Sequence, residues 1–461
     1  MQKYNNLYLI SISLISALGG LLFGYDWVVI GGAKPFYERF FEINHSDALQ
    51  AWAMSSALIG CIIGAILSGV MSDKLGRKLP LFLSAFMFTI ASIGTGFSLN
   101  YHMFIVFRII GGIGIGLASA LSPIYIAEIA PSKLRGRYVS LNQMTIVIGI
   151  LLAQIINLLI AEPVPKDATD EFIRASWNGQ TGWRLMFYVC TIPSILFLVL
   201  IVFLPESPRW LIKNGQEKKA LPILQKTGGL AYAESELKLI KLSMMPITNK
   251  PTAKSIFNKK YASVLFLGFF LAVYQQWSGI NTVFNYADEI FTSAGYGVSD
   301  MLFNIVITGS VNLIFTFVAL WVVDKFGRKK LMLIGSLGLT IAYTFLGVAY
   351  ALNLQGIVIL TIIVLAIGIY AMSLAPIVWV ILSEIFPNQI RGVAMSFATL
   401  ALWIACFILT YTFPLLNSFF GVSGTFWVYA LINFLSLIFI SFRLTETKGK
   451  TLEEIEKYFV N

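Results

Sequence analysis

Long apolar stretches separated by short polar connections dominate the chain. Windows of about 20 apolar residues are long enough to cross a bilayer as helices. Twelve such windows lie near residues 7–31, 50–71, 79–98, 101–127, 139–161, 184–204, 261–290, 301–323, 330–352, 356–384, 392–416 and 424–443. The polar break Pro387–Arg391 divides the tenth from the eleventh. The pattern therefore predicts an all-α membrane protein with twelve transmembrane helices.

Composition indicates that lipid is the solvent for most of this surface. Hydrophobic residues make up 57% of the 461 residues and charged residues 12%, whereas soluble domains carry roughly 25% charged residues. The net charge of +10 does not indicate nucleic-acid binding, because the basic residues follow the alternation of the polar connections. The side opposite the N-terminus holds only Lys34, Arg39, Lys166, Arg174 and Arg184. The positive-inside rule then predicts that both termini are cytoplasmic.

Three polar motifs occur once in each half of the chain, at matching places relative to the spans. The first is Asp-x-x-Gly-Arg-Lys at 73–78 and 324–329, the second is Glu-x-x-Pro-x-x-x-Arg-Gly at 128–136 and 384–392, and the third begins at Glu206 and Glu446. Such a duplication predicts two six-helix parallel repeats. We expect an N-terminal half at 1–204, a cytoplasmic linker with short helices at 205–260, a C-terminal half at 261–444 and a cytoplasmic tail at 445–461.

The repeated charges lie at the cytoplasmic ends of predicted helices. Ion pairs there would hold the cytoplasmic side closed and break when it opens. The candidate gating residues are Asp73, Arg77, Glu128, Arg135, Glu206, Asp324, Arg328, Glu384, Arg391 and Glu446. The alternative is that these charges only set the topology, with Gly76 and Gly327 allowing tight turns.

These motifs closely resemble those of the sugar porter family of the major facilitator superfamily. The matching segments are Gly-Arg-Lys in both halves, Pro-Glu-Ser-Pro-Arg-Trp at 205–210, Gln-Gln-Trp-Ser-Gly-Ile-Asn at 275–281 and Glu-Thr-Lys-Gly-Lys-Thr-Leu-Glu-Glu at 446–454. Within the family, the chain is most similar to the bacterial D-xylose–proton symporters. The resemblance implies the major facilitator fold and import of a monosaccharide, xylose or a hexose such as glucose, with a proton by alternating access. It also implies a multi-pass protein of the bacterial inner (plasma) membrane.

Uncharged amides at membrane depth are candidates for binding a sugar. Amides both donate and accept hydrogen bonds, and an aromatic face covers the apolar side of a sugar ring. On an unbroken seventh helix Asn281 would point away from Gln275 and Gln276, so a common face requires local unwinding, which Gly279 permits. From the residues alone, a single amide is more readily explained as a packing hydrogen bond between helices. The resemblance implies sugar contacts from Phe23, Gln143, Gln275, Gln276, Asn281, Asn312, Trp379 and Trp403.

Two positions depart from the family pattern. Leu402 stands beside Trp403 where sugar porters often carry an amide, and Asn285 replaces the first of two usual tyrosines. These departures weaken the transfer of a particular sugar from the family to this chain. Gln154 is left open between sugar binding and packing.

Asp26 and Arg108 are the charged residues that lie most clearly inside predicted spans. A lone charge in hydrocarbon is costly, so each needs a partner, water or neutralisation, and one acid with one base suggests a pair. The resemblance adds that proton-coupled sugar porters carry Asp at this place in the first span, where facilitative relatives commonly have Asn. We therefore predict that Asp26 carries the proton and that Arg108 responds to its charge; a static buried ion pair is the alternative.

The sequence also bears on functions other than symport. A facilitative uniporter without proton coupling stays open, whereas a sugar sensor without transport is disfavoured by the short tail. Neither a nucleophile–base pair nor a metal cluster appears at membrane depth, and the three cysteines form no Cys-x-x-Cys motif. We therefore expect no enzyme activity, catalytic residue, metal or cofactor. The expected partners are a monosaccharide, protons and the lipid bilayer but not nucleic acid, with the protein acting as a monomer.

Overall fold

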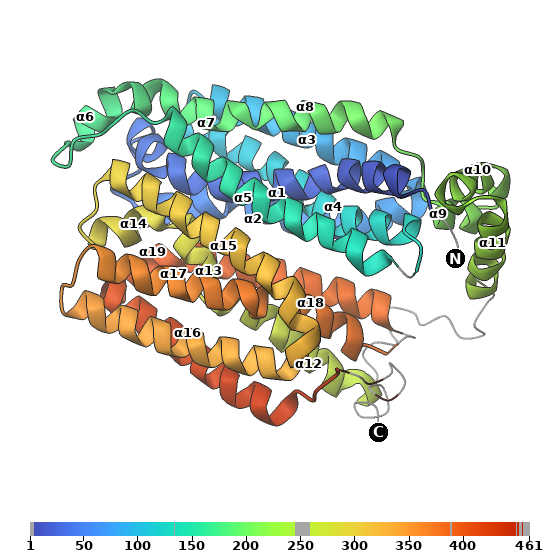
Figure 1. The fold of residues 1–461 in the computed structure, drawn as a ribbon. Coiled ribbons are helices and arrows are strands. Elements are labelled where there is room, and N and C mark those ends of the chain that lie inside the picture. Colours follow the sequence, from blue (N-terminus) through green and yellow to red (C-terminus); the bar gives the residue numbers. More distant parts are fainter. Residues whose placement is uncertain are drawn as a thin grey trace. The chain divides into compact units, whose positions relative to one another are not determined.

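The described residues fold almost entirely as helices (Figure 1). A computed structural model describes residues 4–132, 134–244, 259–387, 390–448, 450 and 454, and it has no strand within them. Over these residues, 11 helical segments are long and apolar enough to cross a membrane. The last, α19 (Arg391–Arg443), is interrupted at Gly421, where φ is 68° and ψ is 173°. The chain therefore has twelve spans, and the predicted all-α membrane fold is confirmed. Helices dominate because backbone groups in lipid must be paired within the chain.

The described helices follow one another with short connections. Those of the first part of the chain are α1 (Asn6–Phe40), α2 (Asp47–Leu75), α3 (Lys78–Phe97), α4 (Tyr101–Ile129), α5 (Arg135–Ile160), α6 (Asp170–Ala175), α7 (Trp183–Val189) and α8 (Thr191–Leu200). The linker forms α9 (Pro208–Lys213), α10 (Glu217–Gly228) and α11 (Leu230–Met244). The second part forms α12 (Lys259–Trp277), α13 (Ile280–Asn285), α14 (Ala287–Ser293), α15 (Val298–Phe326), α16 (Arg328–Ala351), α17 (Ile357–Met372), α18 (Leu374–Ile385) and α19.

The first span is longer than its apolar pattern predicts. We expected it to end near residue 31, but α1 continues to Phe40. Lys34, assigned from the sequence to the following loop, instead lies inside the helix with 1% of its surface exposed. That assignment was wrong because Lys34 pairs with Glu38 one turn further on, so the helix stays favourable past the apolar window.

The seventh span is broken, as the sequence predicts. Gly279 has φ 90°, a left-handed conformation that ends α12 at Trp277 and lets α13 begin at Ile280. A second break at Tyr286, where φ is −117° and ψ is 35°, separates α13 from α14. The amide-rich motif therefore surrounds a non-helical turn rather than lying along a straight helix.

The chain forms two compact units that cut across the predicted halves. Unit 1 comprises Met1–Trp27, Ile59–Ile150 and Phe187–Lys250, and unit 2 comprises Val28–Leu58, Leu151–Met186 and Pro251–Asn461. Segments from the first part of the chain belong to unit 2 because they bond to its later helices. The backbone N–H of Val164, for example, donates to the Ser299 hydroxyl at 2.9 Å.

Small residues let α2 and α4 approach closely within unit 1. A Cβ on Gly60 would collide with the carbonyl oxygen of Ile109, and one on Gly64 with that of Ile113. Close backbone approach through small residues is a common basis for helix packing in membranes, where the hydrophobic effect between helices is absent. It fixes the position of α4, which carries Arg108.

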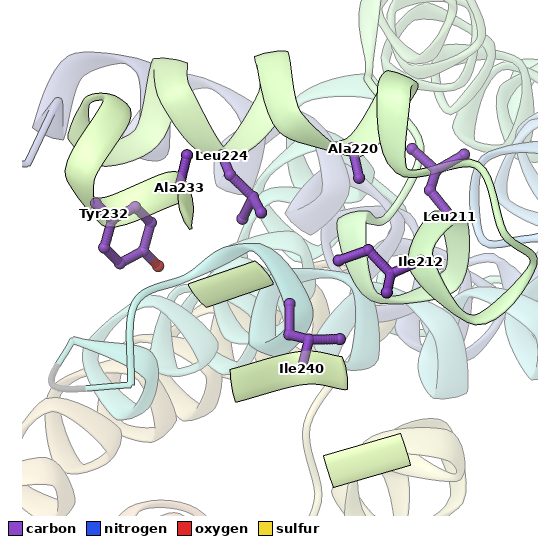
Figure 2. Close-up of a cluster of buried hydrophobic side chains, with 7 residues drawn as sticks. All are labelled: Leu211, Ile212, Ala220, Leu224, Tyr232, Ala233 and Ile240. Atoms are coloured by element: carbon purple, nitrogen blue, oxygen red, sulfur yellow. The ribbon is translucent and has the colours of Figure 1, made fainter. Parts of the chain in front are cut away.

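The linker helices have a small hydrophobic core of their own. Figure 2 shows it, built from α9, α10 and α11 by Leu211, Ile212, Ala220, Leu224, Tyr232, Ala233 and Ile240. Trp210 packs at its edge, and its indole N–H donates to the carbonyl of Asp73 at 3.0 Å. The linker is thus an ordered part of unit 1, and a hydrogen bond from Trp210 connects it to the end of α2.

We predict that Leu224→Ala loosens the linker without disturbing the spans. Leu224 is 2% exposed, and removing a buried leucine side chain costs about 2–5 kcal/mol. Amide hydrogen exchange should accelerate in α10 and α11 but not in α3 or α4. Leu239→Ala is the matched control, because Leu239 is 56% exposed on α11. Equal protection of the linker in both variants would contradict a linker core.

Candidate functional site

Asp26 and Arg108 form an ion pair inside unit 1. Arg108 Nη1 donates to Asp26 Oδ1 at 2.8 Å. The Arg108 side chain is 4% exposed and the Asp26 side chain is 10% exposed. Asp26 comes from the middle of α1 and Arg108 from the first half of α4. The guanidinium also lies over the ring of Phe187, 5.8 Å from its centroid. The pairing suggested by the sequence is therefore present.

This pair is incompletely satisfied. Asp26 Oδ2 and Arg108 Nε are both buried without a hydrogen-bond partner among the residues that the structure describes. The described contact between the two side chains is therefore one hydrogen bond, which leaves one oxygen of the carboxyl group uncommitted.

The amides of the seventh span gather around the break in unit 2. Asn281 donates through Nδ2 to Gln276 Oε1, across the turn at Gly279. Gln275 donates to the carbonyl of Ala375 at 3.1 Å, while its own Oε1 is buried without a partner. The break therefore brings Gln276 and Asn281 together, which an unbroken helix would separate, and leaves an acceptor on Gln275 available.

The other predicted sugar contacts are distributed over both units. In unit 2, Asn312 is 8% exposed, Trp403 is 4% exposed and Trp379 is 37% exposed. In unit 1, Phe23 and Gln143 are half-buried, and the Phe23 ring meets the Trp27 ring edge-on with centroids 5.9 Å apart. Trp379 thus offers the largest exposed face of the three unit 2 residues.

Gln154 stands out among the remaining amides. It is 1% exposed, and both its Oε1 and its Nε2 lack a hydrogen-bond partner. Its side chain lies against Gly309 of α15, where a Cβ would collide with it. The described residues therefore supply no hydrogen bond to this amide, and its role stays open between sugar binding and packing.

Three gating candidates of unit 1, Arg77, Glu128 and Glu206, form one compact arrangement. Arg77 Nη2 donates to Glu128 Oε1 at 2.7 Å, and the Ser207 hydroxyl donates to Glu128 Oε2 at 2.5 Å. Glu206 accepts the backbone N–H groups of Arg77 and Lys78 at 2.8 Å and 3.2 Å. The ends of α2 and α4 and the start of the linker are thereby joined.

Unit 2 repeats this arrangement residue for residue. Arg328 Nη2 donates to Glu384 Oε1 at 3.1 Å, and the Thr447 hydroxyl donates to Glu384 Oε2 at 2.6 Å. Glu446 accepts the backbone N–H groups of Arg328 and Lys329 at 2.8 Å and 3.1 Å. The duplication seen in the sequence is therefore also a duplication of contacts.

The remaining gating candidates have different partners. Asp73 pairs with Lys213 at 2.9 Å, on the exposed surface of the linker. Arg135 donates to the carbonyl of Ala127 at 2.9 Å, and Arg391 to that of Phe386 at 3.1 Å. The side chain of Asp324 lies outside the described residues. Arg135 and Arg391 thus bind the carbonyl end of the preceding helix.

Sequence reasoning missed a buried charge group on α1 and α14. Lys34 contacts Glu38 and Glu289, and the Lys34 and Glu38 side chains are 2% and 4% exposed. A signal was present, because an acid and a base four residues apart directly follow the first apolar window and can share one helix face. The window stops at residue 31, which placed both residues in a loop.

Comparisons with known proteins cover nearly the whole chain. The family model described as "Sugar (and other) transporter" matches residues 12–459. The chain is 39% identical to the D-xylose-proton symporter of Escherichia coli strain K12, over 98% of this chain and 96% of that protein. It is 37% identical to the arabinose-proton symporter of Bacillus subtilis strain 168, over 98% and 95%. Among solved structures it is similar to an inward open conformation of the E. coli xylose transporter XylE, with TM-score 0.85, 38% identity and coverage of 98% and 100%.

We predict that Gly279→Ala destabilises the broken helix. A left-handed backbone costs an alanine about 1–2 kcal/mol, and the new Cβ would lie 2.8 Å from the Tyr429 ring. The midpoint of thermal unfolding should fall. Gly392→Ala is the control, since a Cβ there meets nothing within 4 Å, and it should leave the midpoint unchanged or raise it. A similar unfolding midpoint for both variants would contradict this prediction, because it would mean that a side chain at position 279 causes no strain in the turn.

We also predict that Glu206 and Glu446 each hold their own turn. The pKa of Glu446 is lowered, because backbone N–H groups of Lys448, Arg328 and Lys329 outweigh the opposing effect of burial. A depressed pKa means that this stabilisation is complete above the usual glutamate pKa of about 4.3 and is lost as pH falls through the depressed value.

At neutral pH, Glu446→Gln should accelerate hydrogen exchange at residues 327–330 and leave 76–79 protected. Glu206→Gln should do the reverse, so each variant is the control for the other. In the wild-type protein, protection of 327–330, corrected for intrinsic exchange, should decline only in strong acid. Protection that is unchanged in both variants would contradict a capping role for these carboxylates.

Proposed function

Because the chain belongs to the family of sugar (and other) transporters, we propose that it is a secondary active transporter that imports a monosaccharide with a proton by alternating access. It is a transporter and not an enzyme, as its family and fold establish. The observation that carries proton coupling is the Asp26–Arg108 pair, with one unpaired carboxylate oxygen, buried within a membrane span.

The proposed substrate is xylose or a hexose such as glucose. Two relatives are named for the transport of xylose and arabinose with protons. The residues proposed to bind the sugar are Phe23, Gln143, Gln275, Gln276, Asn281, Asn312, Trp379 and Trp403. The free acceptor on Gln275 supports a hydroxyl contact there, and the exposed face of Trp379 supports stacking against the ring.

Proton coupling follows from the cost of a charge in hydrocarbon. When Asp26 is ionised, its attraction for Arg108 holds α1 and α4 together. Protonation at Oδ2 neutralises the carboxyl group and frees the guanidinium to take other partners, so the helices can rearrange with sugar bound. Release of the proton on the other side restores the pair. Sugar and proton therefore cross together, and the gradient of one drives the other.

The repeated charge arrangements are proposed to control the cytoplasmic side. The excess of Lys and Arg supports placing them, with both termini, in the cytoplasm of a bacterial inner membrane. Each arrangement braces helix ends within its own unit through one arginine and two glutamates. Breaking them would let the linker and the tail separate from the turns they cap. We further propose that one chain is sufficient for transport.

We predict that Asp26→Asn separates coupling from binding. In liposomes, an inward gradient of one pH unit is worth about 1.4 kcal/mol, which supports up to about tenfold accumulation for one proton per sugar. The variant should lose this accumulation but retain exchange of labelled xylose or glucose, because asparagine preserves the shape and not the titration.

Asp167→Asn is the control, since Asp167 is an exposed residue of a connecting segment, and it should accumulate sugar like the wild-type protein. Downhill flux that ignores both the gradient and the Asp26 substitution would identify a uniporter with a static ion pair. Gradient-driven accumulation that survives in Asp26→Asn would place the coupling proton elsewhere.

A further inference from the structure

A second group of buried charges lies in unit 2, apart from the residues assigned above to sugar and proton. The ammonium nitrogen of Lys34 is 3.1 Å from Glu38 Oε2, 2.5 Å from Glu289 Oε1 and 4.0 Å from Asp288 Oδ2. Lys34 and Glu38 belong to α1, and the other two carboxylates belong to the first turn of α14. We call these four residues the α1–α14 cluster. It joins two helices that are about 250 residues apart in the chain.

The α1–α14 cluster has more acid than base. One ammonium faces three carboxyl groups, and among the described residues Lys34 is their only ion-pair partner. The remaining group that faces Lys34 is the Tyr286 ring, 5.8 Å from the nitrogen, and its hydroxyl donates to the carbonyl of Thr410. The phenol therefore adds no compensating positive charge.

Two carboxylate oxygens of the cluster are buried without a hydrogen-bond partner in the described part of the chain. They are Glu38 Oε1 and Glu289 Oε2, and the Glu38 side chain is only 4% exposed. An ionised carboxylate with an unsatisfied buried oxygen is expensive, and like charges around a single ammonium add to the cost. Some species must neutralise at least one of these oxygens.

A proton meets this requirement better than a metal ion does. Within the described residues there is no group of three or more His, Cys, Asp or Glu side chains placed to hold a metal. A proton needs only one oxygen, and the resulting O–H becomes a donor within the cluster. It would leave one ammonium, two carboxylates and one neutral carboxyl group.

We propose that the α1–α14 cluster is a second proton-binding site, which takes up a proton on Glu38 or Glu289 when α1 packs against α14 and releases it when they separate. The step forms one carboxyl O–H bond from a proton of the surrounding water and breaks none within the protein. Its role in transport rests on the proposed function, whereas the binding of the proton does not.

Close packing makes this site conditional on conformation. A Cβ on Gly31 would lie 2.6 Å from the carbonyl oxygen of Phe284, so α1 approaches the α13–α14 segment with its backbone. While they touch, Glu38 Oε1 and Glu289 Oε2 are shielded from water, and when they part, these oxygens meet water and the carboxyl group ionises. With cytoplasmic termini, this end of α1 faces outward, so external acid favours closing of the outer side and alkali favours opening.

Infrared spectroscopy of the purified full-length protein tests the proposal without sugar. The carbonyl stretch of a neutral carboxyl group is separate from that of a carboxylate, so a buried protonated acid is seen directly. The measurement uses the Asp26→Asn protein, in which Asp26 cannot contribute. A carboxylic acid band should be present at neutral pH and should disappear in alkali.

Glu38→Gln and Glu289→Gln should each abolish that band, because either change removes a negative charge and with it the need for the proton. Glu42→Gln is the matched control, since Glu42 is 62% exposed in an ion pair with Arg174, and it should keep the band. If one of the first two variants fails to fold, the other decides.

Absence of the band at neutral pH, or its persistence in the folded Glu38→Gln or Glu289→Gln protein, would overturn the proposal. Neither result depends on transport. A failure of gradient-driven accumulation with the band present would overturn symport and leave this proton site standing.

Discussion

A charged side chain inside hydrocarbon has to be paired, hydrated or neutralised, and this constraint governs how the chain is built. Asp26 and Arg108 meet it by pairing at 2.8 Å, which ties α1 to α4. The pair leaves Asp26 Oδ2 without a hydrogen-bond partner among the described residues, and this is the oxygen that we propose takes the transported proton. The rest of unit 1 positions these two groups.

Packing and backbone breaks provide that positioning. Glycines between α2 and α4 permit close approach and so fix the helix that carries Arg108. In unit 2, the left-handed turn at Gly279 brings Gln276 and Asn281 together. The break in the seventh span therefore gathers amide groups that an unbroken helix would separate.

The repeated charge arrangements show that duplication preserved contacts as well as sequence. Glu206 and Glu446 each cap the turn that follows a long helix, and Arg77 and Arg328 each reach a glutamate at the end of another. Each of these contacts joins two residues of the same unit, so each unit has its own set of connected helix ends.

Much of this could be predicted from the sequence, and the exceptions have physical causes. Apolar windows gave the twelve spans, and the isolated acid and base within them predicted the Asp26–Arg108 pair, because few charges lie at that depth. The same windows placed Lys34 outside the first span, because a charged residue ends an apolar window. In the structure Lys34 is buried within α1, where Glu38 one turn away and Glu289 of α14 balance its charge. The partners of Asp73 and Arg135 were also hidden, because they depend on how the linker and helix ends fold back.

The most direct test of the central claim is to follow the pH of a weakly buffered suspension of cells or vesicles when sugar is added. If sugar and proton cross together through Asp26, the medium becomes alkaline on addition of xylose or another transported monosaccharide, and Asp26→Asn abolishes the change. Sugar flux at the normal rate with no alkalinisation would contradict symport and reduce the Asp26–Arg108 pair to a structural contact.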